Sequence, residues 1–324
     1  QKLEFYAQGE WWVMSTDTPN LASAGDPTPG ARGMFAGGFS PNTSTSSNEI
    51  QYINIASTGN AQDFGNLLNS NHTPLANSSS TRGVIGGGNT GSDTNVIQFV
   101  TIPSTGNATD FGDLTQTRRN AAGLSNQTRG LFCGGWSSPA NYDVIDYITI
   151  AQTGNAVDFG NLTLAREFVG TCASPTRGVI MGGATPTLRS VVEFITISTL
   201  GNGTEYGELT VAKSFAGGCS NPIRGLYGGG TTNNSPRVRT DAIEYVTIAS
   251  SGNTTNFGDL TESRDALAAC ASSIRGVFAG GYAPSMVNGI TYVQIMSTGN
   301  SVDFGDLTDV VARFPGMSNA HGGL

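Results

Sequence analysis

The chain has 324 residues, of which 37% are hydrophobic, only 12% are charged and 45 are glycine. This composition favours one large, turn-rich β structure over a pair of helical domains. The net charge is −8 and the only lysines are Lys2 and Lys213, so the sequence argues against a basic surface for nucleic acid. It also contains no apolar run of 18 residues, so no membrane-spanning helix is expected.

Residues 1–30 precede the repeated part of the chain and form an aromatic arm followed by a linker. The arm contains Phe5, Tyr6, Trp11 and Trp12, and the linker ends in the Pro/Gly/Asp-rich stretch DPTPGA. Aromatic side chains at this density need a buried environment. Two hypotheses stay open: the arm packs on the flank of its own molecule, or it docks into a socket on another subunit, where Trp and Tyr make effective anchors.

A six-fold repeat follows, marked by an Arg-Gly pair, two apolar residues and a double glycine. Its arginines are 47 to 51 residues apart, a period typical of an array of supersecondary units. The repeat arginines are Arg32, Arg82, Arg129, Arg177, Arg224 and Arg275.

Each unit contains four segments that are expected to be strands. In the third unit they are RNAAGLSN, RGLFCGG, VIDYITIAQ and NAVDFGNLT, in that order. Apolar and polar residues alternate in VIDYITI, and β-branched and aromatic types dominate it, which is typical of a strand and not of a helix.

The glycines of the unit predict its turns. Gly-Asn follows the third strand six times, and we interpret it as a two-residue type II′ hairpin with glycine at the first central position. The double glycine is interpreted as a place where a neighbouring backbone leaves no room for a side chain. The Gly-Asn pairs begin at Gly59, Gly106, Gly154, Gly201, Gly252 and Gly299.

An aromatic residue precedes a glycine in the fourth segment of every unit, as in DFGDL. Its ring is expected to fill the gap between adjacent sheets. The flanking acids allow two hypotheses: a calcium site, or an ion pair or turn cap with the repeat arginine. We favour a partly buried Arg–carboxylate pair at each junction, because a planar guanidinium can satisfy a carboxylate and nearby carbonyls together. The aromatic residues are Phe64, Phe111, Phe159, Tyr206, Phe257 and Phe304.

Three of the four cysteines occupy one equivalent position of the repeat. Cys172, Cys219 and Cys270 each lie five residues before a repeat arginine. No C-x-x-C spacing occurs, and only His72 and His321 could assist in binding a metal. The cysteines are therefore predicted to be buried packing residues, and no metal or cofactor is predicted.

These features resemble the kelch repeat of β-propellers over roughly residues 31–319. Aromatic residues where kelch carries tryptophan make the sequence kelch-like and not strictly kelch. The double glycines are matched by Gly37-Gly38, Gly86-Gly87, Gly134-Gly135, Gly182-Gly183, Gly228-Gly229 and Gly280-Gly281, and the kelch tyrosine by Tyr52, Phe99, Tyr147, Phe194, Tyr245 and Tyr292.

The resemblance implies an all-β, six-bladed propeller with four antiparallel strands per blade. In kelch propellers a C-terminal strand commonly completes the first blade, so residues 313–319 are expected to join the sheet of residues 32–68. The competing candidate is LASAG, residues 21–25. Residues 320–324 would then be a short C-terminal tail.

The sequence gives little support for an enzyme. A copper radical oxidase of the galactose oxidase kind needs histidine ligands and a Tyr–Cys pair, which two histidines do not supply. The S-x-D-x-G-x-T-W boxes of sialidase-like propellers are not matched by STGNATDFGDLT. A non-enzymatic protein is therefore predicted.

Binding is the alternative, because the loops after the double glycines vary while the rest of the unit repeats. Loops on a rigid scaffold commonly carry binding surfaces. If these loops share one face, the predicted binding residues are Trp136, Tyr142, Arg189, Arg237, Arg239 and Tyr282; the other hypothesis is neutral drift of exposed turns.

The low lysine content and nearly identical repeats are also similar to kelch-like proteins in tailed-phage virions. That similarity implies a tail, fibre or capsid-decoration component, in a virion or outside the cell, that contacts other virion or surface proteins or a host-surface glycan. The second hypothesis is a secreted carbohydrate-binding lectin or adhesin.

Overall fold

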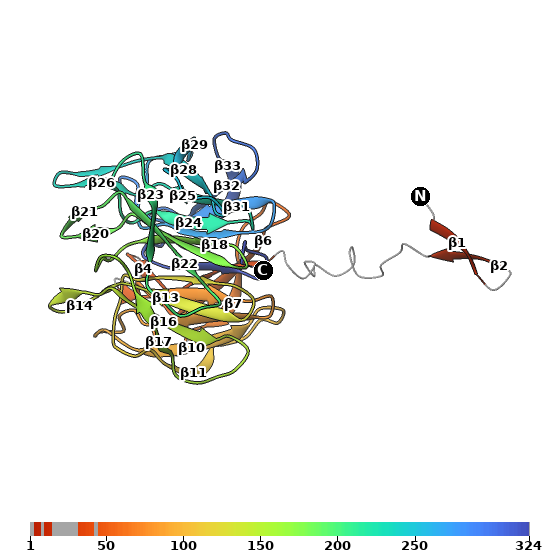
Figure 1. The fold of residues 1–324 in the computed structure, drawn as a ribbon, viewed down its shortest axis with the longest axis horizontal. Coiled ribbons are helices and arrows are strands. Elements are labelled where there is room, and N and C mark those ends of the chain that lie inside the picture. Colours follow the sequence, from red (N-terminus) through yellow and green to blue (C-terminus); the bar gives the residue numbers. More distant parts are fainter. Residues whose placement is uncertain (1–2, 8–9, 15–31, 42–44, 324) are drawn as a thin grey trace.

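The computed structural model describes residues 3–7, 10–14, 32–41 and 45–323. Within these ranges the chain is all-β and forms a six-bladed propeller, in which each blade is a four-stranded antiparallel sheet (Figure 1). The predicted fold class is therefore confirmed.

The blades are numbered in chain order, with their strands given from the central channel outward. Blade 1 is β34 (Gly316–Ser318), β3 (Arg32–Ala36), β6 (Glu49–Asn54) and β7 (Gln62–Asn66); blade 2 is β8 (Leu75–Ser78), β9 (Arg82–Gly86), β10 (Val96–Thr101) and β11 (Thr109–Asp113); blade 3 is β12 (Ala122–Ser125), β13 (Arg129–Cys133), β16 (Val144–Thr149) and β17 (Val157–Asn161). Blade 4 is β18 (Gly170–Ala173), β19 (Arg177–Met181), β22 (Val191–Thr196) and β23 (Thr204–Glu208); blade 5 is β24 (Gly217–Ser220), β25 (Arg224–Gly228), β28 (Ala242–Thr247) and β29 (Thr255–Asp259); blade 6 is β30 (Ala268–Ala271), β31 (Arg275–Ala279), β32 (Gly289–Gln294) and β33 (Val302–Asp306).

Among the described residues, five further hairpins lie outside the blades. At the N-terminus β1 (Leu3–Ala7) pairs antiparallel with β2 (Glu10–Met14). The others follow double glycines: β4 (Phe39–Ser40) with β5 (Thr45–Ser46), β14 (Trp136–Ser137) with β15 (Ala140–Asn141), β20 (Ala184–Thr185) with β21 (Thr187–Leu188), and β26 (Thr231–Asn234) with β27 (Arg237–Arg239).

The ring is closed by the C-terminal strand, as predicted. β34 pairs with β3, with Gly33 opposite Ser318 and Phe35 opposite Gly316. Arg32 N–H also donates to Asn319 Oδ1 at 3.0 Å. The competing segment LASAG lies outside the described residues.

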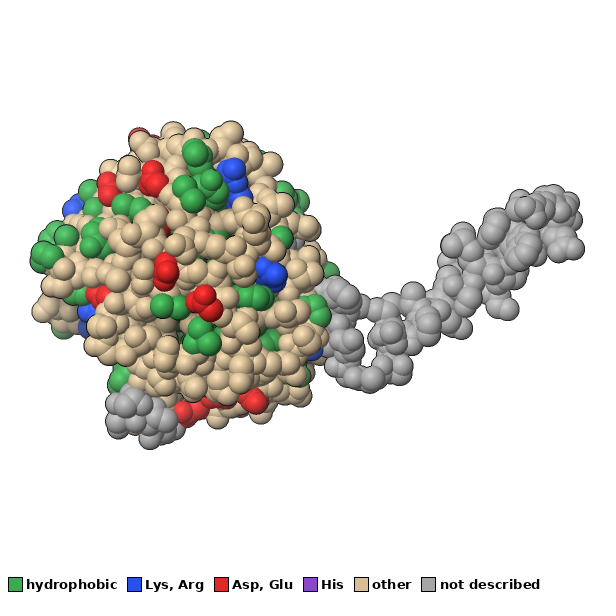
Figure 2. Space-filling model, turned by 90° about the horizontal axis from the view of Figure 1, so that it is seen from below, with side chains coloured by type: hydrophobic (Ala, Val, Ile, Leu, Met, Phe, Trp, Pro, Cys, Tyr) green, Lys and Arg blue, Asp and Glu red, His purple; other side chains and the backbone are tan. Residues whose placement is uncertain are grey.

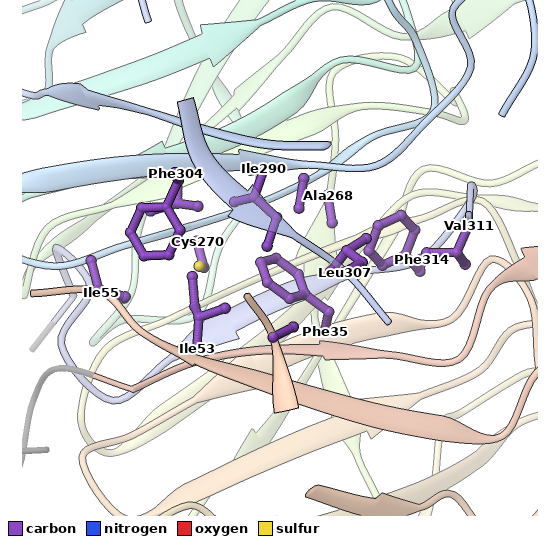
Figure 3. Packing of buried hydrophobic residues seen from close by; sticks show 13 residues of the cluster. Phe35, Ile53, Ile55, Ala268, Cys270, Ile290, Phe304, Leu307, Val311 and Phe314 are labelled. Carbon is purple, nitrogen blue, oxygen red and sulfur yellow. The ribbon is translucent and has the colours of Figure 1, made fainter. Parts of the chain in front are cut away.

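The hydrophobic core lies between neighbouring blades. In Figure 3, Phe35 and Ile53 of blade 1 face Ile290 and Phe304 of blade 6, and all four side chains are buried. The aromatic residue of the fourth strand belongs to these clusters, which confirms its predicted place between sheets. It occupies a bulge: the register of β6 with β7 shifts between Ile50 and Gln51, so that Phe64 is the extra residue.

The predicted pairing of the repeat arginines with carboxylates is wrong. Each guanidinium instead lies over the aromatic ring of its own blade's third strand and donates to a backbone carbonyl of the next blade. Arg82, for example, lies 4.5 Å from the Phe99 ring and donates to the Ile150 carbonyl at 3.0 Å. Arg275 of the last blade reaches the Ile55 carbonyl of the first at 3.0 Å, so the same contact closes the ring.

Carboxylates pair instead with a second set of cations, each of which is fully buried. Arg118 Nη2 lies 3.0 Å from Asp146 Oδ2, and neither side chain is exposed. Arg166 pairs with Glu193, and Lys213 Nζ lies 3.0 Å from Glu244 Oε1. These cations lie in the connections between blades, where their charges are satisfied by the next blade.

The Gly-Asn pairs are not two-residue hairpins. The connection from β6 to β7 runs from Ile55 to Ala61, and its tight turn is closed by Ser57 N–H donating to the Asn54 carbonyl. Gly59 N–H donates to the Phe304 carbonyl of blade 6, and Asn60 Oδ1 accepts from Asp306 N–H at 3.0 Å. Gly-Asn therefore joins neighbouring blades, and it does so at all six junctions.

The double glycine does sit where a neighbouring backbone leaves no room. A Cβ on Gly37, whose φ is +64°, would lie 2.5 Å from the Asn71 carbonyl oxygen. In two units, however, the pair of glycines assigned from the sequence lies one residue before the structurally equivalent pair. The structurally equivalent pairs are Gly87-Gly88 and Gly229-Gly230, since Gly86 and Gly228 end strands β9 and β25.

The glycine after each repeat arginine makes room for an inner-strand side chain of the preceding blade. The Cys270 sulfur packs against Gly33 so closely that a Cβ there would lie 2.7 Å from it. Cys172 and Cys219 lie against Gly225 and Gly276 in the same way. The cysteines are free and buried, which confirms their packing role, and burial raises the pKa of Cys219 to about 12.

Candidate binding site

The variable loops share one face of the propeller, which we call the loop face. In blade 2, Leu75 at the start of the inner strand pairs with Gly86 at the end of β9, so the double glycine and the start of the inner strand lie at the same end. In Figure 1 the hairpins β14, β20, β21 and β26 project on the left and the C-terminus lies on the opposite side.

A ring of six residues in the left-handed conformation surrounds the central channel at the loop face. Non-glycine residues adopt this conformation rarely, and bulky or β-branched ones at a cost. Each lies in the connection before an inner strand, and five of the six neighbouring pairs are joined by backbone hydrogen bonds such as Phe168 N–H to the Asn120 carbonyl at 2.7 Å. The residues are Thr73, Asn120, Phe168, Phe215, Ala266 and Arg313, with φ between 54° and 61°.

The channel encloses a cavity of about 200 Å³ lined by the six inner strands. Its far end is filled by the C-terminal segment. His321 Nε2 lies 3.0 Å from the Ser78 carbonyl, and Gly323 N–H donates to His321 Nδ1 at 3.0 Å. The channel is therefore accessible from the loop face and obstructed at the other end.

At the loop-face mouth lies a second hollow of about 430 Å³, which we call the mouth pocket. Arg119 forms one wall: its guanidinium lies 4.6 Å from the Trp136 ring, and Nη1 is 3.1 Å from Asp93 Oδ1. Asn120 Nδ2 donates to Glu167 Oε2 at 2.7 Å. The lining residues are His72, Thr73, Arg119, Asn120, Trp136, Glu167, Phe168 and Arg313.

A second cluster continues the arc around the mouth. Phe168 stacks on Phe215 with ring centroids 3.6 Å apart, and the Arg237 guanidinium lies 4.8 Å from the Phe215 ring. Arg237 Nε lies 2.6 Å and Arg239 Nε 3.2 Å from the same oxygen of the fully buried Asp265. Aromatic rings and guanidinium groups thus lie against one another from blade 3 to blade 5.

The structure brings together four of the six predicted binding residues. Trp136 lines the mouth pocket, and Arg237, Arg239 and Tyr282 belong to the second cluster, where Arg239 lies 6.0 Å from the Tyr282 ring. Arg189 contacts its own hairpin, through Nη2 to the Thr185 carbonyl at 2.8 Å, and lines neither pocket.

Tyr142 contributes backbone hydrogen bonds at the base of its loop and lines neither pocket. The surroundings of the arm residues Phe5, Tyr6, Trp11 and Trp12 lie outside what the structure describes.

Sequence analysis missed the residues just before the inner strands. The missed residues lie in the connections between blades, which sequence analysis assigned to the repeated scaffold and not to a binding surface. They are Arg119, Phe168, Phe215, Asp265 and Arg313. A usable signal was present, since the left-handed position and the residue before it both differ chemically from unit to unit: His72-Thr73, Arg119-Asn120, Glu167-Phe168, Ser214-Phe215, Asp265-Ala266 and Ala312-Arg313.

Positive charge exceeds negative charge at the mouth, although the whole chain is acidic. Arg313 is exposed, and no carboxylate of the described residues lies within ion-pair distance of it. Burial, reinforced by the charges of Arg313 and Arg119, lowers the pKa of His72, so this imidazole is neutral at pH 7. By contrast, charged side chains lie singly on the face drawn in Figure 2, which is mostly uncharged.

In the described ranges, no group of three or more His, Cys, Asp or Glu residues is arranged to hold a metal ion. No helix there is long and apolar enough to cross a membrane. No protein-family model matches the chain, and no curated protein matches it either.

Proposed function

We propose that the protein is a non-enzymatic recognition module whose loop face binds a protein or a glycan at a biological surface. This proposal rests on the positions at which the six sequence repeats differ from one another. The contacts that join the blades repeat around the ring, whereas the left-handed positions hold Thr73, Asn120, Phe168, Phe215, Ala266 and Arg313. Differing side chains on an invariant scaffold are typical of binding surfaces.

The composition of the arc supports binding over neutral drift of exposed turns. Drift would scatter aromatic and arginine side chains among separate loops. Here Trp136, Phe168 and Phe215 lie within one continuous surface with Arg119 and Arg237. Aromatic and arginine residues carry a large share of binding energy in protein interfaces.

We further propose that the chain is a kelch-like component of a virion or extracellular assembly, such as a phage tail, fibre or capsid decoration. Its support is the sequence resemblance: the double glycines, the tyrosine-bearing strand and the low lysine content. In this assignment Phe5, Tyr6, Trp11 and Trp12 anchor the propeller to another subunit. Deleting residues 1–14 is then expected to abolish incorporation into the assembly and leave the thermal unfolding midpoint of the propeller unchanged.

Glycan arrays and immobilised cell envelopes test the recognition function. Trp136→Ala and Tyr282→Ala are each expected to weaken binding at least tenfold. Ile274→Ala is the matched control, because Ile274 is 64% exposed in the turn before β31, at the opposite end of the blade from the loops. Equal binding by all three variants, or binding to no surface component, would refute the proposal.

A secreted lectin is the second candidate. It is favoured by the half-buried rings of Trp136 and Phe168 beside the amide of Asn120, since a sugar offers both a C–H face and hydroxyl groups. Binding to free saccharides without incorporation into any particle would support the lectin over the virion component.

A further inference from the structure

We infer that the mouth pocket binds a carboxylate-bearing saccharide, such as a uronic or sialic acid residue, with its carboxylate on Arg313. This inference rests on the proposed recognition function and names its ligand class. The pocket's volume of about 430 Å³ falls within the ~300–1,000 Å³ of small-molecule sites.

The guanidinium of Arg313 is the group that we expect to bind an anion. Arg313 is held at the mouth by its backbone, since its N–H donates to the Ala266 carbonyl at 2.9 Å and its φ is +61°. Its side chain is exposed and has no carboxylate partner in the described part of the chain. A planar guanidinium fits a carboxylate through two parallel hydrogen bonds.

The charges around Arg313 favour a single negative charge on the ligand. Arg119 is already balanced by Asp93, and Glu167 adds a second carboxyl group to the wall. Glu167 accepts a hydrogen bond from Asn120, so Arg313 is the one cation lining the pocket that has no carboxylate partner among the described residues. Asp93 and Glu167 repel a multiply charged phosphate or sulfate cluster more strongly than a single carboxylate.

The other walls suit a sugar ring. Phe168 and Trp136 present half-buried aromatic surface, and Asn120, Thr73 and His72 add polar groups. Several of these are fixed in place: Asn120 by Glu167, Trp136 by Arg119 and His72 Nδ1 by Ser46 Oγ at 2.7 Å. A preorganised wall of this kind lowers the entropy lost on binding.

The test compares ligands that differ only in charge. Trigalacturonic acid and its fully methyl-esterified form are titrated calorimetrically into the full chain, and sialyllactose is compared with its sialic acid methyl ester. Each acid is expected to bind at least tenfold more tightly than its neutral counterpart. Arg313→Gln is expected to reduce the affinity for the acid at least tenfold, and Arg313→Lys to recover part of it.

Arg189→Gln is the matched control, because it removes a loop-face arginine outside the pocket, and it should bind as the unchanged protein does. Thermal unfolding midpoints show that each variant is folded. Equal binding of acid and ester, unchanged affinity in Arg313→Gln, or binding of sulfated sugars or acidic peptides alone would overturn the inference. If the acidic saccharides fail to bind but neutral glycans or cell envelopes still bind in a way that depends on Trp136, only the proposed ligand class is refuted. If nothing binds, the ligand class and the proposed recognition function are both refuted.

Discussion

Two sets of cations cross the blade junctions and find their partners in different parts of the chain. The repeat arginines donate to backbone carbonyls, as Arg177 does to Ile248 and Ala249. Five of the six lie partly exposed, and Arg32 is buried. The second set lies fully buried and has a side-chain partner in addition to backbone carbonyls, as Arg118 has Asp146 besides the Phe132 carbonyl. The first set is present in all six units and the second in only four.

The partners explain this difference. A backbone carbonyl is present whatever the sequence, so an arginine that binds one can be repeated without any change elsewhere. A buried charge needs a matching side chain, so the two positions must change together. Asn71 and Val311 replace the cation at two junctions, and there the neighbouring carboxylate position holds Gln98 and Gln51. Arg264 breaks this rule, because it faces Thr291.

The largest expected effect comes from breaking a buried pair. Asp146→Ala leaves the Arg118 charge buried without its carboxylate and should cost about 3–5 kcal/mol of unfolding free energy. Urea unfolding measures this loss. The double variant Arg118→Asn/Asp146→Gln copies the Asn71 and Gln98 junction and is expected to be more stable than Asp146→Ala alone. A double variant less stable than that single one would show that the positions do not form a pair.

A steric test leaves both sets of cations in place. In Gly225→Ala the new methyl group overlaps the Cys172 sulfur, and such overpacking should cost about 1–3 kcal/mol. Adding Cys172→Ala makes room, so the double variant should lose less than the sum of its parts. Gly289→Ala is the control, because no atom lies within 4 Å of its added Cβ. Equal losses at both glycines would contradict the proposed fit.

A repeat arginine should matter less than a buried one. Arg177→Met loses two hydrogen bonds to carbonyls and a contact with the Phe194 ring at 4.2 Å, together about 1–2 kcal/mol at this partly exposed site. Chemical denaturation measures the loss, and Arg177→Lys, which retains charge without the planar donor geometry, should fall in between. A loss as large as that of Asp146→Ala would remove the distinction between the two sets.

The smallest expected effect is a gain. Burial lowers the pKa of Arg264 to about 10, since it has no carboxylate partner like those of Arg166 and Lys213. Thr291→Glu places a carboxylate where Glu193 and Glu244 lie in other blades and should raise stability by about 1 kcal/mol. Thr291→Gln has the same shape without the charge. If both substitutions shift the thermal midpoint equally, charge pairing is not the cause.

Sequence patterns predicted the blades and the closing strand well because these follow from features within one unit. Strand alternation, the packing aromatic and the GMSN copy of an inner strand can all be found by comparing units. Contacts between units could not be predicted in this way. Turn preferences describe Gly59 and Asn60 as a hairpin, whereas their hydrogen bonds go to Phe304 and Asp306 of another blade.

The site was predictable in part for the same reason. Trp136, Arg237, Arg239 and Tyr282 stood out because their loops differ between units. Arg313 did not, because it lies in a connection before an inner strand and not in a loop after a double glycine. Its importance depends on the closed ring, which places it beside His72 and Arg119, more than 190 residues earlier in the chain.

Closure by β34 also determines when the molecule can become complete during its synthesis. Arg32 and Asn319, which hydrogen bond across the closure, are separated by 287 positions. Until β34 has left the ribosome, the inward edge of β3 has no partner in its blade, and an unpaired edge invites pairing with another chain. The nascent propeller is thus most vulnerable to aggregation just before β34 is synthesised.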